Sequence, residues 1–232
     1  MGGEDWPDVA RLPHGYTNLT TLSAGVVRKR YLGPDAQQRE HVERAALEAL
    51  WGRFPVPRVL PSTGELGTAE VAGRHGQEVL DDSDEQRVRN VLRLCGRLRR
   101  DLSEIDPESV PGLPGAGNVI VHGDFGPQNL LVNNDGDSAQ AVVDWEWAHL
   151  GNPIEDLAWA EWIVRTHHPD AVPYLGELFD GYGARPGWAD RKSAMLRMCH
   201  QCKDLCERWD NPAAAALWSS RIAATSSFTE VT

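Results

Sequence analysis

Apolar and polar residues divide the first 72 positions into short strands around a single helix. Tyr16–Leu22 and Gly25–Tyr31 have the composition and length of two neighbouring β-strands, and Leu66–Ala72 predicts a further strand. Between them, apolar residues in Gln37–Trp51 recur every three or four positions, which predicts a helix. This part of the pattern indicates a small β-rich lobe with one helix.

Helical spacing dominates the remaining positions, with one interruption by short strands. Ser83–Gln86 has the composition of a capping box and opens a helix that extends to about Ile105. Asn118–Val121 then predicts a short strand, and Leu130–Val132 and Ala139–Val143 predict a hairpin around an Asn-Asn-Asp-Gly turn. The chain is therefore expected to be an α+β protein with a mainly helical second lobe.

The loop between these strands carries the most informative residues. Asp124 ends a His-Gly-Asp run, Asn129 follows five positions later, and Asp144 comes fifteen positions beyond that. Kinase-type phosphotransferases present a base and two metal ligands in this order. Asp124 would orient the acceptor hydroxyl and accept its proton, whereas Asn129 and Asp144 would hold Mg²⁺, which favours hard oxygen ligands. Because the hairpin brings its two ends together, these two ligands are expected to lie close in space.

The motifs resemble those of the aminoglycoside phosphotransferase and choline kinase superfamily, over a region from about residue 15 to about residue 162. The family carries H-G-D-x-x-x-x-N, which is His122–Asn129 here, and then D-x-E or D-x-D, which is Asp144–Glu146. The run Gly151–Ala158 is also similar. The glycine after His122, in place of the arginine of protein kinases, points to the small-molecule branch.

The resemblance implies a bilobal, protein-kinase-like fold. It places an N-terminal nucleotide-binding lobe at residues 1–72 and a C-terminal catalytic and acceptor-binding lobe at residues 73–232. It also implies ATP or GTP as the phosphate donor, Mg²⁺ as the metal and a hydroxylated small molecule as the acceptor.

The resemblance also assigns a phosphate-binding lysine and its acidic partner to the first lobe. Lys29 matches the family's V-x-K-R-Y pattern, with the arginines on either side of it as alternatives. Glu43 falls where family members carry the paired glutamate, and Glu40 and Glu48 compete for that role.

The segment after the last strand of the first lobe resembles the family's nucleotide hinge. Main-chain groups near Glu70, Val71 and Ala72 are expected to face the adenine, and Gly73 and Gly76 suit a connection between the lobes. The glycine-rich loop of protein kinases has no counterpart in this sequence, so the phosphate-clamping loop is left unlocated.

Further acids and a histidine are candidates for supporting the site. Asp156 is either an acid placed for the dipole of the helix that follows Pro153 or the family's aspartate that braces the catalytic loop through His122. Glu146 and Glu161 could bind an amine-bearing acceptor, and a plain surface position is nearly as good an interpretation of each.

A cluster of cysteines could indicate zinc or a buried helix face. Cys199, Cys202 and Cys206 recur with Met195 and Trp209 at helical spacing. Because buried cysteines behave as small hydrophobic residues, this spacing favours the packed face of an amphipathic helix over a zinc site.

Charge and composition limit the classes of molecule that the protein is expected to bind and the cellular compartment in which it is expected. A formal net charge of −11 over 232 residues argues against nucleic-acid binding and is compatible with a cationic substrate. The sequence has no apolar stretch long enough to span a membrane, its N-terminus lacks the apolar core of a signal peptide, and its cysteines do not suggest a disulfide framework. A cytoplasmic location is therefore expected, and no oligomeric state is indicated.

Three functions are compatible with these residues. The first is a kinase that phosphorylates a hydroxyl of an aminoglycoside-like or other cationic antibiotic. The second is the same chemistry on a metabolite such as choline, homoserine or an amino sugar. The third is a non-catalytic nucleotide-binding module, which predicts decay of the catalytic residues. The presence of Lys29, Asp124, Asn129 and Asp144 disfavours this third function.

Overall fold

The computed structural model describes residues 10–11, 18–82 and 84–231. Its N-terminal part is a five-stranded antiparallel sheet with one helix. In sheet order the strands are β1 (Ala10–Arg11), β2 (Asn18–Ser23), β3 (Val26–Tyr31), β5 (Leu66–Ala69) and β4 (Val59–Leu60), and the helix is α1 (Ala36–Leu50).

The predicted hairpin is present in the part of it that the structure describes, while Tyr16 and Thr17 lie outside the described residues. Its turn is made by Ala24 and Gly25, which both have positive φ, as a two-residue type I′ turn requires. Strand β3 is central in the sheet and pairs with β2 on one side and β5 on the other. This position holds Lys29 opposite Thr20 and Leu66, so its backbone is fixed from both sides.

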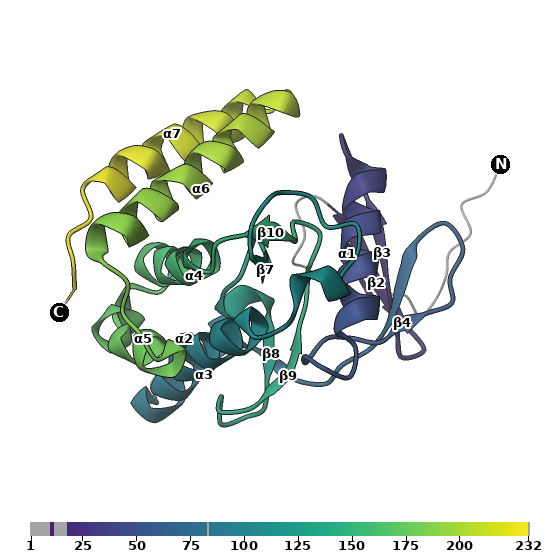
Figure 1. Ribbon diagram of the computed structural model, residues 1–232, viewed down its shortest axis with the longest axis horizontal. Helices are drawn as coiled ribbons and strands as arrows, with labels where there is room; N and C mark the ends of the chain where they lie inside the picture. The colour runs from purple at the N-terminus through teal and green to yellow at the C-terminus, as the bar shows by residue number, and fades with distance from the viewer. Residues whose placement is uncertain (1–9, 12–17, 83, 232) are drawn as a thin grey trace.

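Helices dominate the C-terminal part (Figure 1). The helices are α2 (Gly76–Leu80), α3 (Glu85–Ser103), α4 (Ile154–His167), α5 (Gly176–Tyr182), α6 (Trp188–Arg208) and α7 (Pro212–Ser226), with short 3₁₀ turns η1 (Pro107–Ser109), η2 (Pro127–Asn129) and η3 (Pro169–Tyr174). The strands are β6 (Arg74–His75), β7 (Val119–Val121), β8 (Leu130–Val132), β9 (Ala139–Val142) and β10 (His149–Gly151).

These short strands frame the loop His122–Asn129, which carries the predicted catalytic motif and is called the catalytic loop from here on. Strand β8 pairs with β6 and β9 in one small sheet, and β7 pairs with β10 in another. Figure 1 shows the N-terminal strands and α1 on one side of them and the helices on the other, with the α6–α7 hairpin lying over α4. The catalytic loop is thus held where the two parts of the molecule meet.

The start of α3 and the position of Gly76 differ from what the sequence predicts. Helix α3 is capped by Asp84, whose side chain accepts hydrogen bonds from the amides of Gln86 and Arg87, and Ser83 lies outside the described residues. Gly76 does not link the lobes but begins α2, where a Cβ atom would lie 2.9 Å from the carbonyl oxygen of Pro127. A side chain there would push against the catalytic loop.

Apolar side chains form two packed clusters. The larger cluster runs from Tyr31 and α1 through Phe125 and Trp145 to α3 and α5. The smaller one joins α4 to α6 around Trp159 and Met195. Among the helices that the structure describes, none combines the length and apolarity needed to cross a membrane.

Helices α3 and α5 pack with their backbones in direct contact at two glycines. A Cβ atom on Gly96 would lie 2.0 Å from the carbonyl oxygen of Leu178, and one on Gly181 would lie 2.0 Å from that of Arg93. Alanine normally stabilises a helix by about 1 kcal/mol relative to glycine. At these positions the steric conflict outweighs that gain, because the contacting atoms are backbone.

We therefore expect Gly96→Ala to lower the free energy of unfolding by about 1–3 kcal/mol, the usual cost of overpacking. Gly176→Ala is the matched control, because a Cβ atom at Gly176 in α5 meets no atom within 4 Å. Urea denaturation of both variants measures the difference. Equal stabilities would contradict the close packing of α3 and α5.

Candidate active site

Asp124 lies half-buried in the loop between β7 and η2, with its carboxylate held from two sides. The Nδ2 group of Asn129 donates to Oδ2 at 2.9 Å, and the indole Nε1–H of Trp159 donates to Oδ1 at 2.7 Å. Burial raises the pKa of Asp124 to about 7, and the hydrogen bond from Trp159 opposes that rise. The carboxylate is therefore oriented while it keeps a high affinity for a proton, as a proton acceptor requires.

The loop needs glycine next to Asp124. Gly123 has φ +83°, and a Cβ atom on it would lie 2.3 Å from the carbonyl oxygen of Trp147. Both the backbone conformation and the close approach exclude larger residues. This requirement explains the glycine of the His-Gly-Asp run in physical terms.

His122 supports the loop from the interior. Its ring is fully buried, with Nε2 at 3.0 Å from the carbonyl oxygen of Val143 and Nδ1 at 3.2 Å from the amide nitrogen of Asp124. Because the amide can only donate, Nδ1 accepts and Nε2 carries the hydrogen that is donated to Val143. Burial lowers the pKa of His122, which agrees with a neutral ring. The histidine thus connects the catalytic loop to the strand end that leads to Asp144.

Asp156 braces the same loop through its backbone. The carboxylate accepts the amide of His122 at 2.9 Å and that of Gly123 at 3.0 Å. It also pairs with the guanidinium of Arg99 at 2.9 Å, and both side chains are fully buried. Arg99 in turn donates to the carbonyl oxygen of Ile120 at 2.9 Å. One aspartate therefore ties the N-terminus of α4 to the catalytic loop and to α3.

Other residues cap α4, so Asp156 is not needed for that task. The side chain of Asn152 accepts the amide of Ile154 at 3.0 Å, while the side chain of Glu155 accepts the amide of Asn152 at 2.6 Å. This is the reciprocal arrangement of a capping box. Asp156 is in the first turn, where the helix dipole favours an acid, but its carboxylate points into the protein.

Lys29 meets two carboxylates from different parts of the chain. Its Nζ lies 2.6 Å from Oε2 of Glu43 in α1 and forms a second ion pair with Asp144, which follows β9. Burial alone would lower the pKa of Lys29, but these carboxylates and that of Glu146 outweigh it and raise the pKa. The ammonium is therefore kept charged in a buried place.

The residues that the sequence offered in place of Lys29 and Glu43 are exposed or paired with other side chains. Residues 28 and 30 of β3 are exposed, as the period of the strand requires. In α1, Glu40 pairs with Arg44 at 2.9 Å and Glu48 is exposed. Among these acids of α1, the structure places only Glu43 next to Lys29.

Asp144 has the geometry of a constrained functional residue. Its φ is +69°, a left-handed conformation that non-glycine residues rarely adopt. The amide of the preceding Val143 donates to the carbonyl oxygen of Asn129 at 2.9 Å, which brings the two predicted metal ligands onto adjacent backbone. Because Nδ2 of Asn129 is engaged by Asp124, its Oδ1 is the atom left for a cation. One carboxylate and one amide oxygen suit Mg²⁺.

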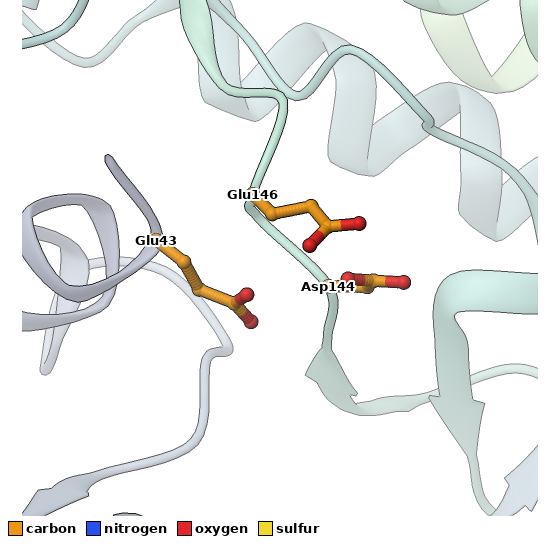
Figure 2. A group of neighbouring side chains, drawn as sticks. All are labelled: Glu43, Asp144 and Glu146. Carbon is orange, nitrogen blue, oxygen red and sulfur yellow. The ribbon is translucent and has the colours of Figure 1, made fainter. Parts of the chain in front are cut away.

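A second group of oxygen ligands surrounds the lysine. Glu43, Asp144 and Glu146 offer carboxylate oxygens within 4.8 Å of one another, and Figure 2 shows Glu43 reaching in from α1 towards the loop of the other two. The ammonium of Lys29 lies among these oxygens, at 3.6 Å from Glu146, and Tyr31 donates to Glu43 at 2.5 Å. The carboxylates are thus already balanced by protein groups.

Glu146 does not act as predicted for an acceptor-binding residue. It is 3% exposed, and its Oε2 accepts from Asn18 of β2 at 2.7 Å and from Arg39 of α1 at 2.9 Å. Burial and these partners leave it unable to receive an amine from outside. It connects the loop after β9 to the N-terminal part instead.

Glu161 is likewise not placed for an acceptor. It is fully buried in α4, where Arg165 pairs with one carboxylate oxygen at 2.7 Å and Arg191 of α6 pairs with the other at 2.6 Å. Two guanidinium groups neutralise it and occupy both oxygens. Its role in this structure is to join α4 to α6.

The predicted hinge follows β5, which ends at Ala69. The amide of Glu70 donates to the carbonyl oxygen of Gly25 at 2.9 Å and so extends the sheet by one bond. That amide is therefore not available to a nucleotide, and Ala72 follows two residues later. The contact of this segment with adenine stays a prediction, as does the lobe boundary at residues 72 and 73.

Among the residues that the structure describes, the cysteines of α6 are not grouped with other ligands as closely as a shared metal ion requires. Cys199 is fully buried, and its Sγ lies 3.8 Å from Oγ1 of Thr225, while Cys202 and Cys206 are partly buried. Over the described ranges of the chain, the carboxylates around Lys29 are the only group of three ligands close enough to share an ion. The arrangement agrees with a packed helix face.

Sequence reasoning missed two residues of the site. Trp159 has no role assigned from the sequence, yet its indole N–H donates to the carboxylate of Asp124. Arg39 had no assigned role, although it lies one helical turn before Glu43 and therefore on the same face of α1. That spacing was the one signal that could have identified it.

Known proteins match this chain in sequence over part of its length. Residues 111–193 match the model of the phosphotransferase enzyme family. Viomycin phosphotransferase of Streptomyces vinaceus is 34% identical over 100 residues, which are 42% of this chain and 30% of that protein. A probable acyl-CoA dehydrogenase of Arabidopsis thaliana is 30% identical over 111 residues, 47% of this chain and 12% of that protein. The matches thus span less than a third of these relatives' length.

Solved structures resemble nearly the whole chain. A GDP and kanamycin complex of APH(2")-IIia has a TM-score of 0.73 at 14% identity, covering 95% of this chain and 93% of that one. A gentamicin complex of APH(2")-IIa has a TM-score of 0.75 at 13% identity, covering 94% and 91%. A choline/ethanolamine kinase family protein from Mesorhizobium loti has a TM-score of 0.64 at 19% identity, covering 95% and 88%.

The structural likeness at these low identities concerns the fold, and the sequence match concerns the region that contains the catalytic loop. The resemblance to the aminoglycoside phosphotransferase and choline kinase superfamily is therefore confirmed, with residues 111–193 matching the phosphotransferase enzyme family and nearly the whole chain having the α+β, protein-kinase-like fold of its solved members.

Proposed function

We propose that this protein is a kinase that transfers the γ-phosphate of ATP or GTP to a hydroxyl group of a small molecule. The observation that carries the proposal is the convergence of four elements on one place: Lys29 of β3 contacts Glu43 of α1 and Asp144 after β9, and Asn129 beside Asp144 holds Asp124. Phosphoryl transfer requires this combination of charge, metal ligands and a proton acceptor.

The chain's own residues would divide the work as follows. Asp124 accepts a hydrogen bond from the acceptor hydroxyl and takes its proton as the new bond from oxygen to phosphorus forms. The bond between the γ-phosphorus and its bridging oxygen breaks, and the nucleoside diphosphate leaves. Lys29 binds phosphate oxygens of the donor, and Glu43 keeps that ammonium in place. The brace from Asp156 holds the loop during the transfer.

Asn129 and Asp144 are the residues that would hold Mg²⁺. The metal supplies positive charge that neutralises the phosphates in the transition state. Oδ1 of Asn129 and the carboxylate of Asp144 fit a hard cation, and Asp144 is fixed by its backbone conformation. The ion pair between Asp144 and Lys29 supports this role, because it already places a cation against this carboxylate.

The acceptor proposed first is a cationic antibiotic of the aminoglycoside or basic-peptide kind. This choice is supported by the likeness to a viomycin phosphotransferase and to APH(2") structures in complex with kanamycin and gentamicin. A metabolite acceptor of the choline type is the second candidate, supported by the likeness to a choline/ethanolamine kinase family protein. A cytoplasmic location agrees with either acceptor, because nucleoside triphosphates are available there.

The test is consumption of ATP and GTP against a panel of hydroxylated compounds, with and without Mg²⁺. The panel contains aminoglycosides, basic peptide antibiotics, choline, homoserine and amino sugars. Acceptor-dependent turnover that requires Mg²⁺ supports the proposal and identifies the acceptor class. Tight nucleotide binding without turnover on any acceptor would favour a binding module, and the absence of nucleotide binding would exclude a kinase.

Asp144 offers a test of the metal site. Asp144→Asn keeps a residue that tolerates positive φ but removes the charge. We expect it to weaken Mg²⁺–nucleotide binding by at least about 10–100-fold, which is the loss seen when a residue that only hydrogen-bonds to a metal ligand is replaced. Titration calorimetry measures the change. Asp135→Ala, in the exposed turn of the same hairpin, is the control and should bind normally. Unchanged affinity of Asp144→Asn would remove Asp144 from the metal site.

A further inference from the structure

Trp159 is in direct contact with the candidate base. Its indole Nε1–H donates to Oδ1 of Asp124 at 2.7 Å, and the side chain is 5% exposed. The residue projects from α4, one turn after the Asp156 that braces the backbone of the same loop. Helix α4 therefore reaches both the backbone of the catalytic loop and the carboxylate at its centre.

The ring of Trp159 is fixed by a stack of indoles. The ring of Trp162 lies parallel to it, with centroids 4.4 Å apart and an interplanar angle of 3°. Trp218 of α7 stacks on both, at 6.2 Å from Trp159 and 5.6 Å from Trp162. A ring held between helices in this way has little freedom to turn its N–H away from Asp124.

A hydrogen-bond chain anchors the stack to the last helix. The Nε1–H of Trp162 donates to Oγ1 of Thr225 at 2.8 Å, and that hydroxyl donates to the carbonyl oxygen of Arg221 at 2.8 Å. Thr225 is 1% exposed. The position of Trp159 is thus determined by α7, which is more than fifty residues away in the sequence.

Hydrogen bonds on both oxygens of Asp124 together determine how its carboxylate is turned. Asn129 binds Oδ2 at 2.9 Å from one side, and Trp159 binds Oδ1 at 2.7 Å from the other. Gln128 adds a longer one to Oδ1, at 3.4 Å. With a donor on each oxygen, rotation of the carboxylate about its bond to Cβ breaks at least one charge-assisted hydrogen bond. The remaining lone pairs then point in fixed directions, which is what a base needs to receive a hydroxyl proton in line with phosphoryl transfer.

We propose that Trp159 is a positioning residue for phosphoryl transfer, which orients the carboxylate of Asp124 through its indole N–H. The inference rests on the proposed function, because it assigns to Asp124 the role of base. A competing arrangement is that the indole N–H takes the place of the acceptor hydroxyl and inhibits turnover. The two arrangements predict opposite effects of removing the N–H.

The chain offers a matched pair of variants for the kinetic test. Trp159→Phe removes the N–H that binds Asp124 and keeps an aromatic ring in the stack. Trp162→Phe makes the same change in the adjacent ring, whose N–H binds Thr225 and not Asp124. Each variant loses ring area and one indole hydrogen bond, so the difference between them reports the contact of Trp159 with the base.

We expect Trp159→Phe to lower kcat about 10–100-fold, the range that a hydrogen bond to a charged group corresponds to, with an unchanged KM for the nucleotide. Trp162→Phe removes an anchor of the stack but keeps the N–H of Trp159 on Asp124, so it should lower kcat at least about threefold less than Trp159→Phe does. Equal kcat values for Trp159→Phe and Trp162→Phe would overturn the proposal, and a higher kcat for Trp159→Phe would replace it with inhibition by the indole.

A measurement without turnover separates this inference from the proposed function. In a proton–nitrogen correlation spectrum of the nitrogen-15-labelled protein, Trp159→Phe and Trp162→Phe identify the two indole signals by their loss. Asp124→Asn should shift the Trp159 signal and leave that of Trp162 in place. If the Trp159 signal does not shift in Asp124→Asn, the contact between Trp159 and Asp124 is absent in solution and the inference is wrong, whether or not the protein is active. A wild type with no turnover on any acceptor would instead contradict the proposed function.

Discussion

Replacing Asp124 by alanine is expected to reduce turnover by about 10²–10⁴-fold, the contribution of a positioned general base. The reason is that the carboxylate is the acceptor at the centre of the loop, oriented by Asn129 and Trp159. Steady-state rates on the acceptor found in the panel measure the effect. Loss of the carboxylate leaves the hydroxyl without a group to take its proton.

Nucleotide binding is the internal control for this variant. Lys29, Glu43 and Asp144 form their ion pairs without any contribution from Asp124. Calorimetric affinity for the Mg²⁺–nucleotide should therefore stay within about threefold of the wild type, well under 1.4 kcal/mol. Near wild-type turnover of Asp124→Ala would show that another residue is the base, while lost nucleotide binding would show that the variant has damaged the fold.

Replacing Asp156 by alanine is expected to lower the free energy of unfolding by about 3–5 kcal/mol, the cost of breaking a buried ion pair by removing one partner. The guanidinium of Arg99 would be left buried without its carboxylate, and the amides of His122 and Gly123 would lose their acceptor. Urea denaturation followed by circular dichroism measures the loss.

An exposed acid in the neighbouring helix provides the comparison. Asp101 in α3 pairs with Arg100, and both side chains are nearly half exposed. Asp101→Ala should therefore cost no more than about 1 kcal/mol, as exposed ion pairs do. If Asp156→Ala were no more destabilising than Asp101→Ala, the network around the catalytic loop would not be an important source of stability.

Local patterns in the sequence account for much of the site. The period of β3 put Lys29 and its arginine neighbours on opposite faces, because successive side chains of a strand alternate, and the structure shows that the face of Lys29 is the buried one. The hairpin between Asn129 and Asp144 follows from a turn of known composition, so their proximity is a short-range property. The spacing of apolar residues predicted the helix α1, whereas the family resemblance singled out Glu43 on it, which the structure buries.

Glu146 and Glu161, which the sequence suggested as acceptor-binding residues, are instead paired with arginines from distant segments. Arg39 and Glu146 are separated by 107 positions, and Arg191 and Glu161 by 30. No local pattern indicates that such pairs meet, so both glutamates looked equally suited to solvent or to a substrate. Once buried, a carboxylate must be paired, and the folded chain supplies the arginines that settle its role.

The sequence by itself determined the order of residues in the catalytic loop, the hairpin that follows it and the alternation of side chains along β3, because strand and turn geometry act over a few residues. Only the tertiary structure decided that Trp159 binds Asp124, that Arg99 completes the brace of Asp156, and that Glu146 and Glu161 are buried. These features depend on helices packing against one another. Packing brings together surfaces from distant segments, so the spacing of residues along one segment does not predict which side chains will meet.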